Sequence, residues 1–295
     1  METMTQEKDL DTFEQVSPML MGLAYRILGS WTDAEDAVQD TYLKWHKADR
    51  ARIENPSSWL TTLCTRRCID LLRSAHRTRV SYVGTWLPEP VHTRAVYRAD
   101  EALSFAPTLE TAFLLLLERL TPKERAAYLL HDIFEAPYPE VAAILGLQES
   151  TCRKLVSRAR THVDRSRVRH VTPPEKQEQL LAAFEAAIAG AGTERLAAML
   201  SDDVELWSDG GGKVPAVPYV LRGKSRILMF VDRGLRRFWS GAQWTLTDLN
   251  GGRGAILLHA DGPTAAVTFA CDEHEALKSI FIVRSPDKLT HLSPA

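Results

Sequence analysis

The sequence has 295 residues and a mass of 33.0 kDa, enough for about two domains of ordinary size. Its 45% hydrophobic and 25% charged residues are close to the globular average and argue against a disordered chain. No run approaches the ~18 consecutive apolar residues of a membrane helix, and the polar, acidic first residues do not resemble a signal peptide. Four cysteines do not make a disulfide framework, so we expect a reduced, cytoplasmic protein with no membrane partner.

The net charge is only −2, but the charges are unevenly distributed along the chain. Residues 1–50 carry five Lys and Arg against ten Asp and Glu, whereas residues 150–170 carry seven against one. Between Arg66 and Arg79 there are five Arg and one Asp. Such alternation predicts one surface for a protein partner and two for a polyanion, with a merely solvated face as the alternative for any single block.

Residues 13 to about 75 have helical periodicity. Thr32-Asp33-Ala34-Glu35 is a capping-box motif and predicts a helix start. The helix that follows places apolar residues on one face and Asp36, Gln39 and Asp40 on the other. Asn55-Pro56 then predicts the start of the next helix, with Asn as the N-cap and Pro at the first helical position.

The helix that begins at Pro56 has an apolar stripe and a polar side. Cys64 and Cys68 lie on the stripe, so we interpret them as core residues and not as metal ligands. Thr62, Arg66 and Arg73 lie on the polar side. Its basic side is the second candidate surface for a polyanion.

Residues 76–105 lose this helical periodicity. The prolines of Trp86-Leu87-Pro88-Glu89-Pro90 exclude a regular helix, so the segment is predicted to be an interdomain linker.

Residues 106–170 are helical again, and Thr121-Pro122-Lys123-Glu124 is a strong helix start. A short helix from Tyr138 ends at Gly146, and a basic amphipathic helix begins near Glu149. A helix, a short turn that contains glycine and a second, basic helix predict a helix-turn-helix.

Pro173-Pro174 opens a third block, in which helices are followed by strands. Strands are predicted at residues 204–207, 244–249, 255–259, 265–270 and 277–283, and Asn250-Gly251 predicts a hairpin turn between two of them. Helices followed by an antiparallel sheet indicate an α+β domain.

Candidates for covalent chemistry are weak throughout the sequence. The segment Asp209-Gly210-Gly211-Gly212-Lys213 fails the phosphate-loop pattern, because that pattern needs an earlier glycine and a Ser or Thr after the lysine. The nine histidines form no metalloenzyme motif. Trp207, Tyr219, Phe230 and Trp239 line a pocket in one interpretation and form plain core in the other. We expect no catalytic residue, no metal and no cofactor.

The motifs of the first two blocks resemble a known family. Residues 24–30 followed by 33–40 resemble region 2 of extracytoplasmic-function (ECF) RNA polymerase sigma factors, and residues 59–73 resemble its promoter-melting helix. Residues 120–126, 138–142 and 155–160 resemble region 4. Many members have Asn after the arginine of the melting helix, but this chain has Arg66-Arg67, so a −10 base preference is not carried over.

The rest of the chain resembles a subgroup of this family with a fused SnoaL-like C-terminal domain. The shared features are the Trp86–Pro90 motif, the Asp209–Lys213 loop and Pro286-Asp287-Lys288-Leu289. The resemblance implies a multidomain chain: region 2 (1–80), a linker (81–105), region 4 (106–170), and a cone-shaped α+β barrel (176–295) that regulates the sigma factor in cis. It further implies that the β and β′ subunits of bacterial core RNA polymerase and promoter DNA are the partners, with duplex at −35 and single strand at −10.

The resemblance and the helix faces together assign candidate site residues. They are Asp33, Asp36, Gln39 and Asp40 for core polymerase; Trp59, Thr62, Arg66, Arg67 and Arg73 for −10 DNA; Ser150, Thr151, Arg153, Lys154, Ser157 and Arg158 for −35 DNA; and Trp86, Leu87, Pro88, Glu89, Pro90, Asp209, Gly210, Gly211, Gly212, Lys213, Asp287 and Lys288 for a regulatory interdomain contact.

Two other functions stay open at this point. One is a helix-turn-helix regulator with a ligand-sensing domain, which binds its operator without polymerase. The other is a SnoaL-like enzyme fused to a DNA-binding module, which requires a His or Asp base in a pocket. An unknown small ligand of the C-terminal domain is compatible with each of these functions.

Overall fold

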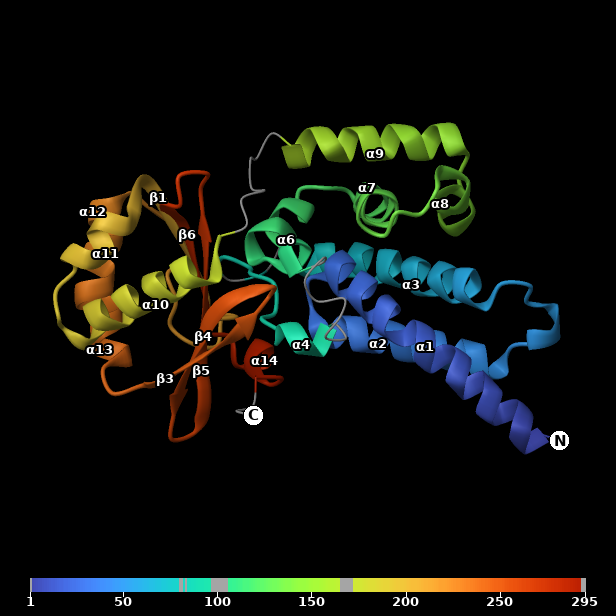
Figure 1. Cartoon of the computed structure of the whole chain (residues 1–295), viewed down its shortest axis with the longest axis horizontal. Coiled ribbons are helices and arrows are strands. Elements are labelled where there is room, and N and C mark those ends of the chain that lie inside the picture. Colours follow the sequence, from blue (N-terminus) through green and yellow to red (C-terminus); the bar gives the residue numbers. More distant parts are fainter. Residues whose placement is uncertain (1, 80–81, 83, 97–105, 165–171, 293–295) are drawn as a thin grey trace. The chain divides into compact units, whose positions relative to one another are not determined.

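The computed structural model describes residues 2–79, 82, 84–96, 106–164 and 172–292, and their side chains except those of 2–11, 75–79, 106–107 and 164. The chain divides into two compact units (Figure 1). The helical unit comprises Met1–Val80, Val96–Asp100 and Leu116–Ser166, and the C-terminal unit comprises Ser81–Ala95, Glu101–Leu115 and Arg167–Ala295. Among the described residues, no helix is both long and apolar enough to cross a bilayer.

The first half of the helical unit consists of three long helices joined by short turns. They are α1 (Glu2–Leu28), α2 (Trp31–Lys47) and α3 (Pro56–Arg79), with a 3₁₀ turn, η1, at Arg50–Arg52. The N-cap of α3 is confirmed, because the Asn55 side chain accepts a hydrogen bond from the backbone N–H of Ser58 (3.0 Å).

The capping box expected at Thr32 is wrong. Helix α2 begins at Trp31, and its N-cap is Ser30, whose hydroxyl accepts a hydrogen bond from the backbone N–H of Asp33 (3.1 Å). Gly29 has a φ of 68° and ends α1, so Ser30 is the first residue free to adopt the extended conformation that a cap needs. Thr32 is therefore already inside the helix.

The second half of the helical unit contains α7 (Pro122–Tyr128), a π-helical segment η3 (Leu129–Ile133), α8 (Tyr138–Leu145) and α9 (Glu149–Asp164). The capping box at Thr121 and Glu124 is confirmed. Helix α8 ends at Gly146, which has the left-handed conformation (φ 63°) of a helix C-cap, and α9 begins at Glu149. The predicted helix, short turn and second helix are thus present.

The two halves pack against each other within the helical unit. The buried guanidinium of Arg125 donates a hydrogen bond to the Ile27 carbonyl at the end of α1 (2.6 Å) and forms an ion pair with Glu118 (2.7 Å). The guanidinium of Arg26 lies 5.6 Å from the centre of the Phe134 ring. Arginines buried in this way need carbonyl and carboxylate partners, which both halves supply.

The C-terminal unit is built on one six-stranded sheet. Its helical elements are α4 (Thr93–Val96), η2 (Ala106–Leu109), α6 (Thr111–Leu117), α10 (Pro174–Ala189), α11 (Glu194–Met199), α12 (Lys224–Met229), η4 (Phe230–Leu235), α13 (Arg236–Trp239) and α14 (Pro286–Leu289), of which α4 and α6 cross a unit boundary. Its strands are β1 (Leu200–Asp209), β2 (Leu221–Arg222), β3 (Gln243–Leu249), β4 (Gly252–His259), β5 (Gly262–Cys271) and β6 (Leu277–Val283).

The strand order is β2-β1-β6-β5-β4-β3. The two-residue hairpin turn is confirmed, since β3 and β4 are joined by Asn250 (φ 50°) and Gly251 (φ 79°). The expectation of an antiparallel sheet is wrong in one place, because β1 and β6 pair in parallel. That pairing joins the first and last long strands of the unit, and no local pattern in the sequence specifies it. The short strand β2 was not expected.

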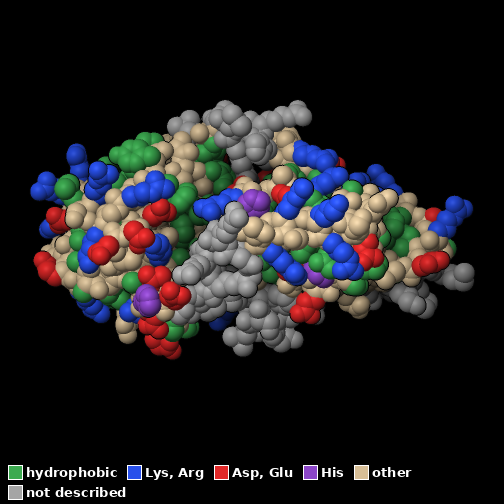
Figure 2. Space-filling model, turned by 90° about the horizontal axis from the view of Figure 1, so that it is seen from above, with side chains coloured by type: hydrophobic (Ala, Val, Ile, Leu, Met, Phe, Trp, Pro, Cys, Tyr) green, Lys and Arg blue, Asp and Glu red, His purple; other side chains and the backbone are tan. Residues whose placement is uncertain are grey.

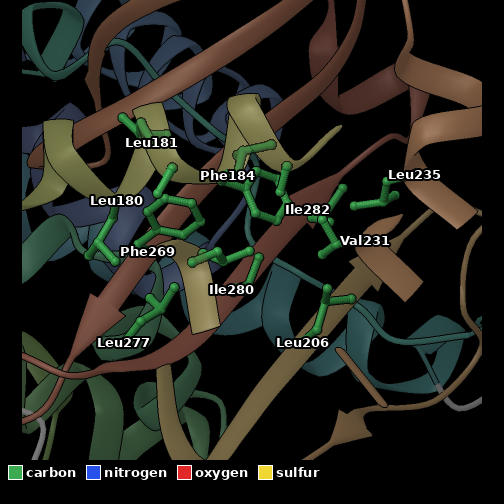
Figure 3. Close-up of a cluster of buried hydrophobic side chains, with 14 of the residues drawn as sticks. Leu180, Leu181, Phe184, Leu206, Val231, Leu235, Phe269, Leu277, Ile280 and Ile282 are labelled. Carbon is green, nitrogen blue, oxygen red and sulfur yellow. The ribbon is translucent and has the colours of Figure 1, made fainter. Parts of the chain in front are cut away.

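Alternating side chains give the sheet two apolar faces. On one face, Ile280 and Ile282 pack with Phe184 of α10 and with Val231 and Leu235 of η4 (Figure 3). On the other face, Phe281 and Val283 pack with Leu87, Ala112 of α6, and Leu289 and Leu292 beyond β6. The second face is therefore covered by the segment that precedes the helix-turn-helix in sequence.

The interpretation of four aromatic residues as one pocket lining is wrong. Trp207 belongs to the second face, with its ring 6.5 Å from that of Phe281. Phe230 and Trp239 pack against the first face, and Tyr219 is 63% exposed. The sheet separates Trp207 from Phe230 and Trp239, because the side chain of Trp207 points to the opposite side of β1 from the first face.

Glu110 gives the C-terminal unit a pH-dependent stability. Burial raises the pKa of its carboxyl from 4.5 to about 7. Between these two pH values the folded chain keeps a proton that the unfolded chain releases, so the free energy of unfolding falls as the pH rises. We expect Glu110→Gln to remove this dependence and to stabilise the protein near pH 7.5 by on the order of 1–3 kcal/mol. Urea unfolding from pH 4.5 to 7.5 measures the free energy of unfolding. If it depends on pH in the same way in both proteins, the raised pKa of Glu110 is contradicted.

Candidate functional site

A buried carboxylate at the end of β1 gathers three parts of the C-terminal unit. Asp209 is fully buried. One carboxylate oxygen accepts hydrogen bonds from the Tyr82 hydroxyl (2.6 Å) and the Gly211 N–H (2.9 Å). The other accepts from the Leu87 N–H (2.9 Å) and the Lys288 ammonium (2.7 Å). Charge-assisted hydrogen bonds of this kind are stronger than neutral ones, so Asp209 ties residues 82–87 to the glycine loop and α14.

Lys288 is the countercharge, and its side chain is only 9% exposed. The ammonium donates a second hydrogen bond to the Leu87 carbonyl (2.5 Å). It also lies 4.4 Å from the centre of the Trp86 ring and 5.3 Å from that of Tyr82. A buried ammonium is tolerated only where carboxylate, carbonyl and aromatic partners replace water, and three of these partners come from the linker. We call Tyr82, Trp86, Leu87, Asp209 and Lys288 the linker clamp.

The protonation state of Tyr82 suits its role as a donor. Burial and the hydrogen bond to Asp209 raise the pKa of the phenol above its ordinary value. The hydroxyl therefore keeps its proton at neutral pH and donates a hydrogen bond to the Asp209 carboxyl oxygen.

The glycine loop lets the chain turn tightly beside the clamp. Gly211 has a φ of 65°, and a Cβ there would collide with the Ser285 side chain. The charged residues expected to form the interdomain contact divide into two groups. Asp209 and Lys288 contact the linker, whereas Lys213 and Asp287 form an exposed ion pair with each other (2.7 Å). Exposed pairs of this kind contribute little stability.

The linker continues along the hairpin turn between β3 and β4. Val91 and Asn250 exchange hydrogen bonds: the Val91 N–H donates to the Asn250 side chain (3.1 Å), and the Asn250 N–H donates to the Val91 carbonyl (3.0 Å). The Gly251 N–H donates to the Thr93 hydroxyl (3.0 Å). Leu87, Pro88, Glu89 and Pro90 are all buried. Sequence analysis missed Tyr82, Val91, Thr93 and Asn250. In the case of Asn250, the Asn-Gly pattern predicts a turn and gives no sign that the same residue also binds the linker.

Helix α9 presents the residues expected at the −35 element. Ser150, Thr151, Arg153, Lys154, Ser157 and Arg158 are all exposed, while Cys152, Val156, Ala159 and Val163 are buried. Figure 2 views the molecule from the side on which α9 lies in Figure 1 and shows Lys and Arg side chains gathered over this part of the helical unit. The basic residues at 165, 167 and 169 lie outside the described residues.

Arg153 differs from its basic neighbours on α9. Its guanidinium forms an ion pair with Glu149 (2.5 Å) and stacks 4.3 Å from the centre of the Tyr138 ring. Lys154 and Arg158 have no ion pair in the part of the chain that the structure describes. Arg153 is thus oriented before any ligand arrives, whereas the other two are free to follow a phosphate backbone.

The residues expected at the −10 element lie on α3 and already have protein partners. The Arg66 guanidinium donates to the carbonyls of Ile144 (3.1 Å) and Ala143 (3.5 Å), at the C-terminal end of α8. Arg73 pairs with Asp70 (3.5 Å), and Trp59 packs against Trp45 with ring centres 5.7 Å apart. The Thr62 hydroxyl donates to the Ser58 carbonyl (2.8 Å). Arg66 is therefore occupied by the helix-turn-helix.

The residues expected to bind polymerase lie along α2. Asp36 and Gln39 are exposed, and Asp33 is half-buried at the first turn. Asp40 forms an ion pair with Arg67 of α3 (2.7 Å), so the structure joins one residue expected to bind polymerase to one expected to bind DNA.

Comparison with known proteins identifies both halves of the helical unit. The Sigma-70 region 2 family matches residues 12–78, and the Sigma-70 region 4 family matches residues 110–163. Over 96% of this chain and 93% of the relative, the sequence is 33% identical to the ECF RNA polymerase sigma factor SigJ of Mycobacterium tuberculosis. The crystal structure of SigJ has a TM-score of 0.75 and covers 97% of this chain and 99% of its own. The ferric citrate uptake sigma factor FecI of Escherichia coli is 32% identical over 46% of this chain and 78% of its own.

The fold is therefore that of a two-module promoter-recognition protein, with region 2, a region 4 helix-turn-helix, and a C-terminal sheet domain. The chain belongs to the ECF RNA polymerase sigma factors. It is a transcription initiation factor, which binds core RNA polymerase and directs it to specific promoters.

Arg158→Ala tests whether α9 contacts promoter phosphates. We expect the holoenzyme to bind promoter duplex more weakly, with the slope of log affinity against log salt shallower by about 0.9, because one phosphate contact releases about one counterion. Fluorescence anisotropy at several salt concentrations measures the slope. Arg153→Ala, by contrast, should relax sequence preference at the −35 element. Wild-type affinity and slope in both variants would refute the assignment of α9.

Arg66→Ala tests the melting helix. We expect the holoenzyme to retain promoter binding but to open the −10 region poorly, because unpaired bases and phosphates there lose a cation. Permanganate footprinting reports strand opening. Arg52→Ala is the control because, among the residues that the structure describes, its exposed guanidinium pairs only with the neighbouring Asp49. Normal opening by the Arg66 variant would show that this residue serves only the packing against α8.

Proposed function

We propose that the C-terminal unit regulates this ECF sigma factor in cis by holding the linker between region 2 and region 4. The observation that carries the proposal is the linker clamp, in which the buried pair of Asp209 and Lys288 binds the backbone of Leu87 on both its N–H and its carbonyl. A contact to both backbone groups fixes the position of the linker, and it does not depend on the side chain at position 87.

The chain order makes this contact effective. Region 2 ends near residue 78 and region 4 begins near residue 110, and residues 81–95 and 101–115 both belong to the C-terminal unit. The two DNA-binding modules are thus connected through segments that another unit holds. Because the contact is intramolecular, its effective concentration is high, so even a modest docking energy favours the held state.

The polymerase and DNA contacts follow from the exposed faces. Asp36 and Gln39, with Asp33 and Asp40, supply an acidic surface for the β and β′ subunits of core polymerase. The exposed face of α9 takes duplex DNA at −35, and Trp59, Thr62, Arg66, Arg67 and Arg73 of α3 take single strand at −10. We place the protein in the cytoplasm, where its polymerase acts.

We also propose that the C-terminal unit is a regulatory module and not an enzyme. The fully buried carboxylate of this unit, Asp209, is engaged with Tyr82, Leu87, Gly211 and Lys288 in holding the linker. Turnover of a small molecule by the purified protein would overturn this part of the proposal, and binding of an unknown small ligand without turnover is compatible with it.

Run-off transcription with core polymerase tests the cis regulation. Trp86→Ala and Asp209→Asn should change promoter output in the same direction as deletion of residues 176–295, because each releases the linker. Removing one partner of the buried ion pair also costs stability, about 3–5 kcal/mol. The cation–π contact of Trp86 is worth only about 0.5–2 kcal/mol, so that variant is expected to remain folded.

Lys213→Ala is the matched control, since it breaks a neighbouring ion pair that lies outside the clamp. It should transcribe like the wild-type protein. In a double-mutant cycle, the effects of Trp86→Ala and Lys288→Met on output should be non-additive. If the deletion and the Trp86 variant both match wild type, the C-terminal unit does not regulate the sigma factor.

A further inference from the structure

A continuous helical segment of the C-terminal unit has an unusual side-chain periodicity. Helices α12, η4 and α13 follow one another without a break from Lys224 to Trp239, and the residues at their junctions keep helical backbone angles. The buried side chains recur at every fourth position, at Ile227, Val231, Leu235 and Trp239. The wider π-helical turns of η4 explain a repeat of four where a regular α-helix has 3.6.

The opposite side of this segment is basic and exposed. With four residues per turn, the side chains two positions away from the buried line point away from the core, and these are Ser225, Met229, Arg233 and Arg237. Arg226 and Phe238 flank them on one side. Met229 and Phe238 are 57% and 54% exposed. We call Arg226, Met229, Arg233, Arg237 and Phe238 the arginine face.

The charge of this segment contrasts with that of the whole chain. Residues 222–239 hold six Lys and Arg and one Asp, in a protein of net charge −2. Two of these cations have carboxylate partners: Arg222 pairs with Glu205 (2.8 Å) and Arg236 with Asp232 (3.7 Å).

Within the described part of the chain, the arginines of the arginine face have no carboxylate partner. Arg226, Arg233 and Arg237 form no ion pair with any residue that the structure describes, although other exposed cations of the unit do. Like charges four residues apart on a helix repel each other weakly, and an anionic ligand relieves this repulsion.

We propose that the arginine face is a third nucleic-acid-binding surface, which holds the phosphate backbone of the nucleic acid in the initiation complex. Arginine forks match phosphate oxygens in two-point contacts, and three of them are presented together. Exposed Phe238 beside them offers a ring on which a base stacks, as in sequence-independent binding of single strands. The contact is therefore with the backbone and does not read bases.

The test compares two triple variants of the full-length protein that change the net charge equally. Arg226→Gln, Arg233→Gln and Arg237→Gln together remove the arginine face. Arg222→Gln, Arg253→Gln and Lys278→Gln are the control, because each of these cations pairs with a carboxylate of the same unit. Anisotropy against salt is measured for the free protein and the holoenzyme, with duplex promoter DNA and with its single strands.

For the arginine-face variant we expect a salt slope shallower by about 2.7 on duplex DNA (three contacts at about 0.9 each) or by about 2.1 on single strands (three at about 0.7 each). Affinity should fall by at least about tenfold at 0.1 M salt. The nucleic acid whose slope changes, duplex or single strand, identifies the one that is bound. The control should keep the wild-type slope. Phe238→Ala should weaken single-strand binding without changing the slope if its ring stacks on a base.

Equal slopes for the two triple variants would overturn the proposal, since they would show a general effect of charge. So would unchanged nucleic-acid binding together with lost binding to vesicles of anionic lipid, which would assign the face to a membrane surface. The linker clamp is intact in both variants, so run-off transcription separates a failure of this proposal from a failure of cis regulation.

Discussion

The architecture of the C-terminal unit depends on how the buried carboxyl oxygens of Asp209 obtain hydrogen-bond donors without water. A fully buried carboxylate is strongly unfavourable unless its oxygens are saturated with donors. Here four donors meet it, from Tyr82, Leu87, Gly211 and Lys288. Two of these donors belong to the linker, so the folded C-terminal unit requires the linker as part of its own hydrogen bonding.

The same dependence appears in the apolar core. Leu87 and Ala112 complete the second face of the sheet, together with Leu289 and Leu292. A sheet whose second face is closed by Leu87 of the linker and by Ala112 near the start of region 4 is not an appended module with an independent core. Displacing the linker exposes apolar surface to water, which costs about 25 cal/mol for each Å² exposed. It also leaves a buried ion pair without its polar neighbours. Both free-energy costs arise when the linker leaves the sheet. They favour two discrete states, with the linker bound or released, over a gradual loosening of the linker.

A second theme is that several basic residues expected to bind nucleic acid already have partners. Arg66 holds carbonyls of α8, Arg67 pairs with Asp40, and Arg153 pairs with Glu149. Binding to DNA then exchanges one set of partners for another and does not simply add contacts, so the net gain is smaller than a count of arginines indicates. Lys154, Arg158 and the arginine face carry no such cost, because the described structure gives them no ion pair.

The sequence by itself determined what is local. The Asn55 and Thr121 caps, the Gly146 helix end and the Asn250-Gly251 hairpin follow from short-range backbone chemistry and appear as expected. The buried stripe and exposed basic side of α9 follow from periodicity. The family likewise follows from motifs that are short stretches of consecutive residues.

The tertiary structure alone decided the pairings between distant segments. Three such pairings are the parallel contact of β1 with β6, the attachment of Val91 to Asn250 and the carbonyl partners of Arg66. They join residues that are 74 to 159 positions apart in the chain. The N-cap of α2 is Ser30 and not Thr32, because Gly29 ends the preceding helix one residue before Ser30. A sequence pattern shows which groups need partners, but the partner of a buried charge is chosen by which elements the fold brings together, and that choice has no local pattern.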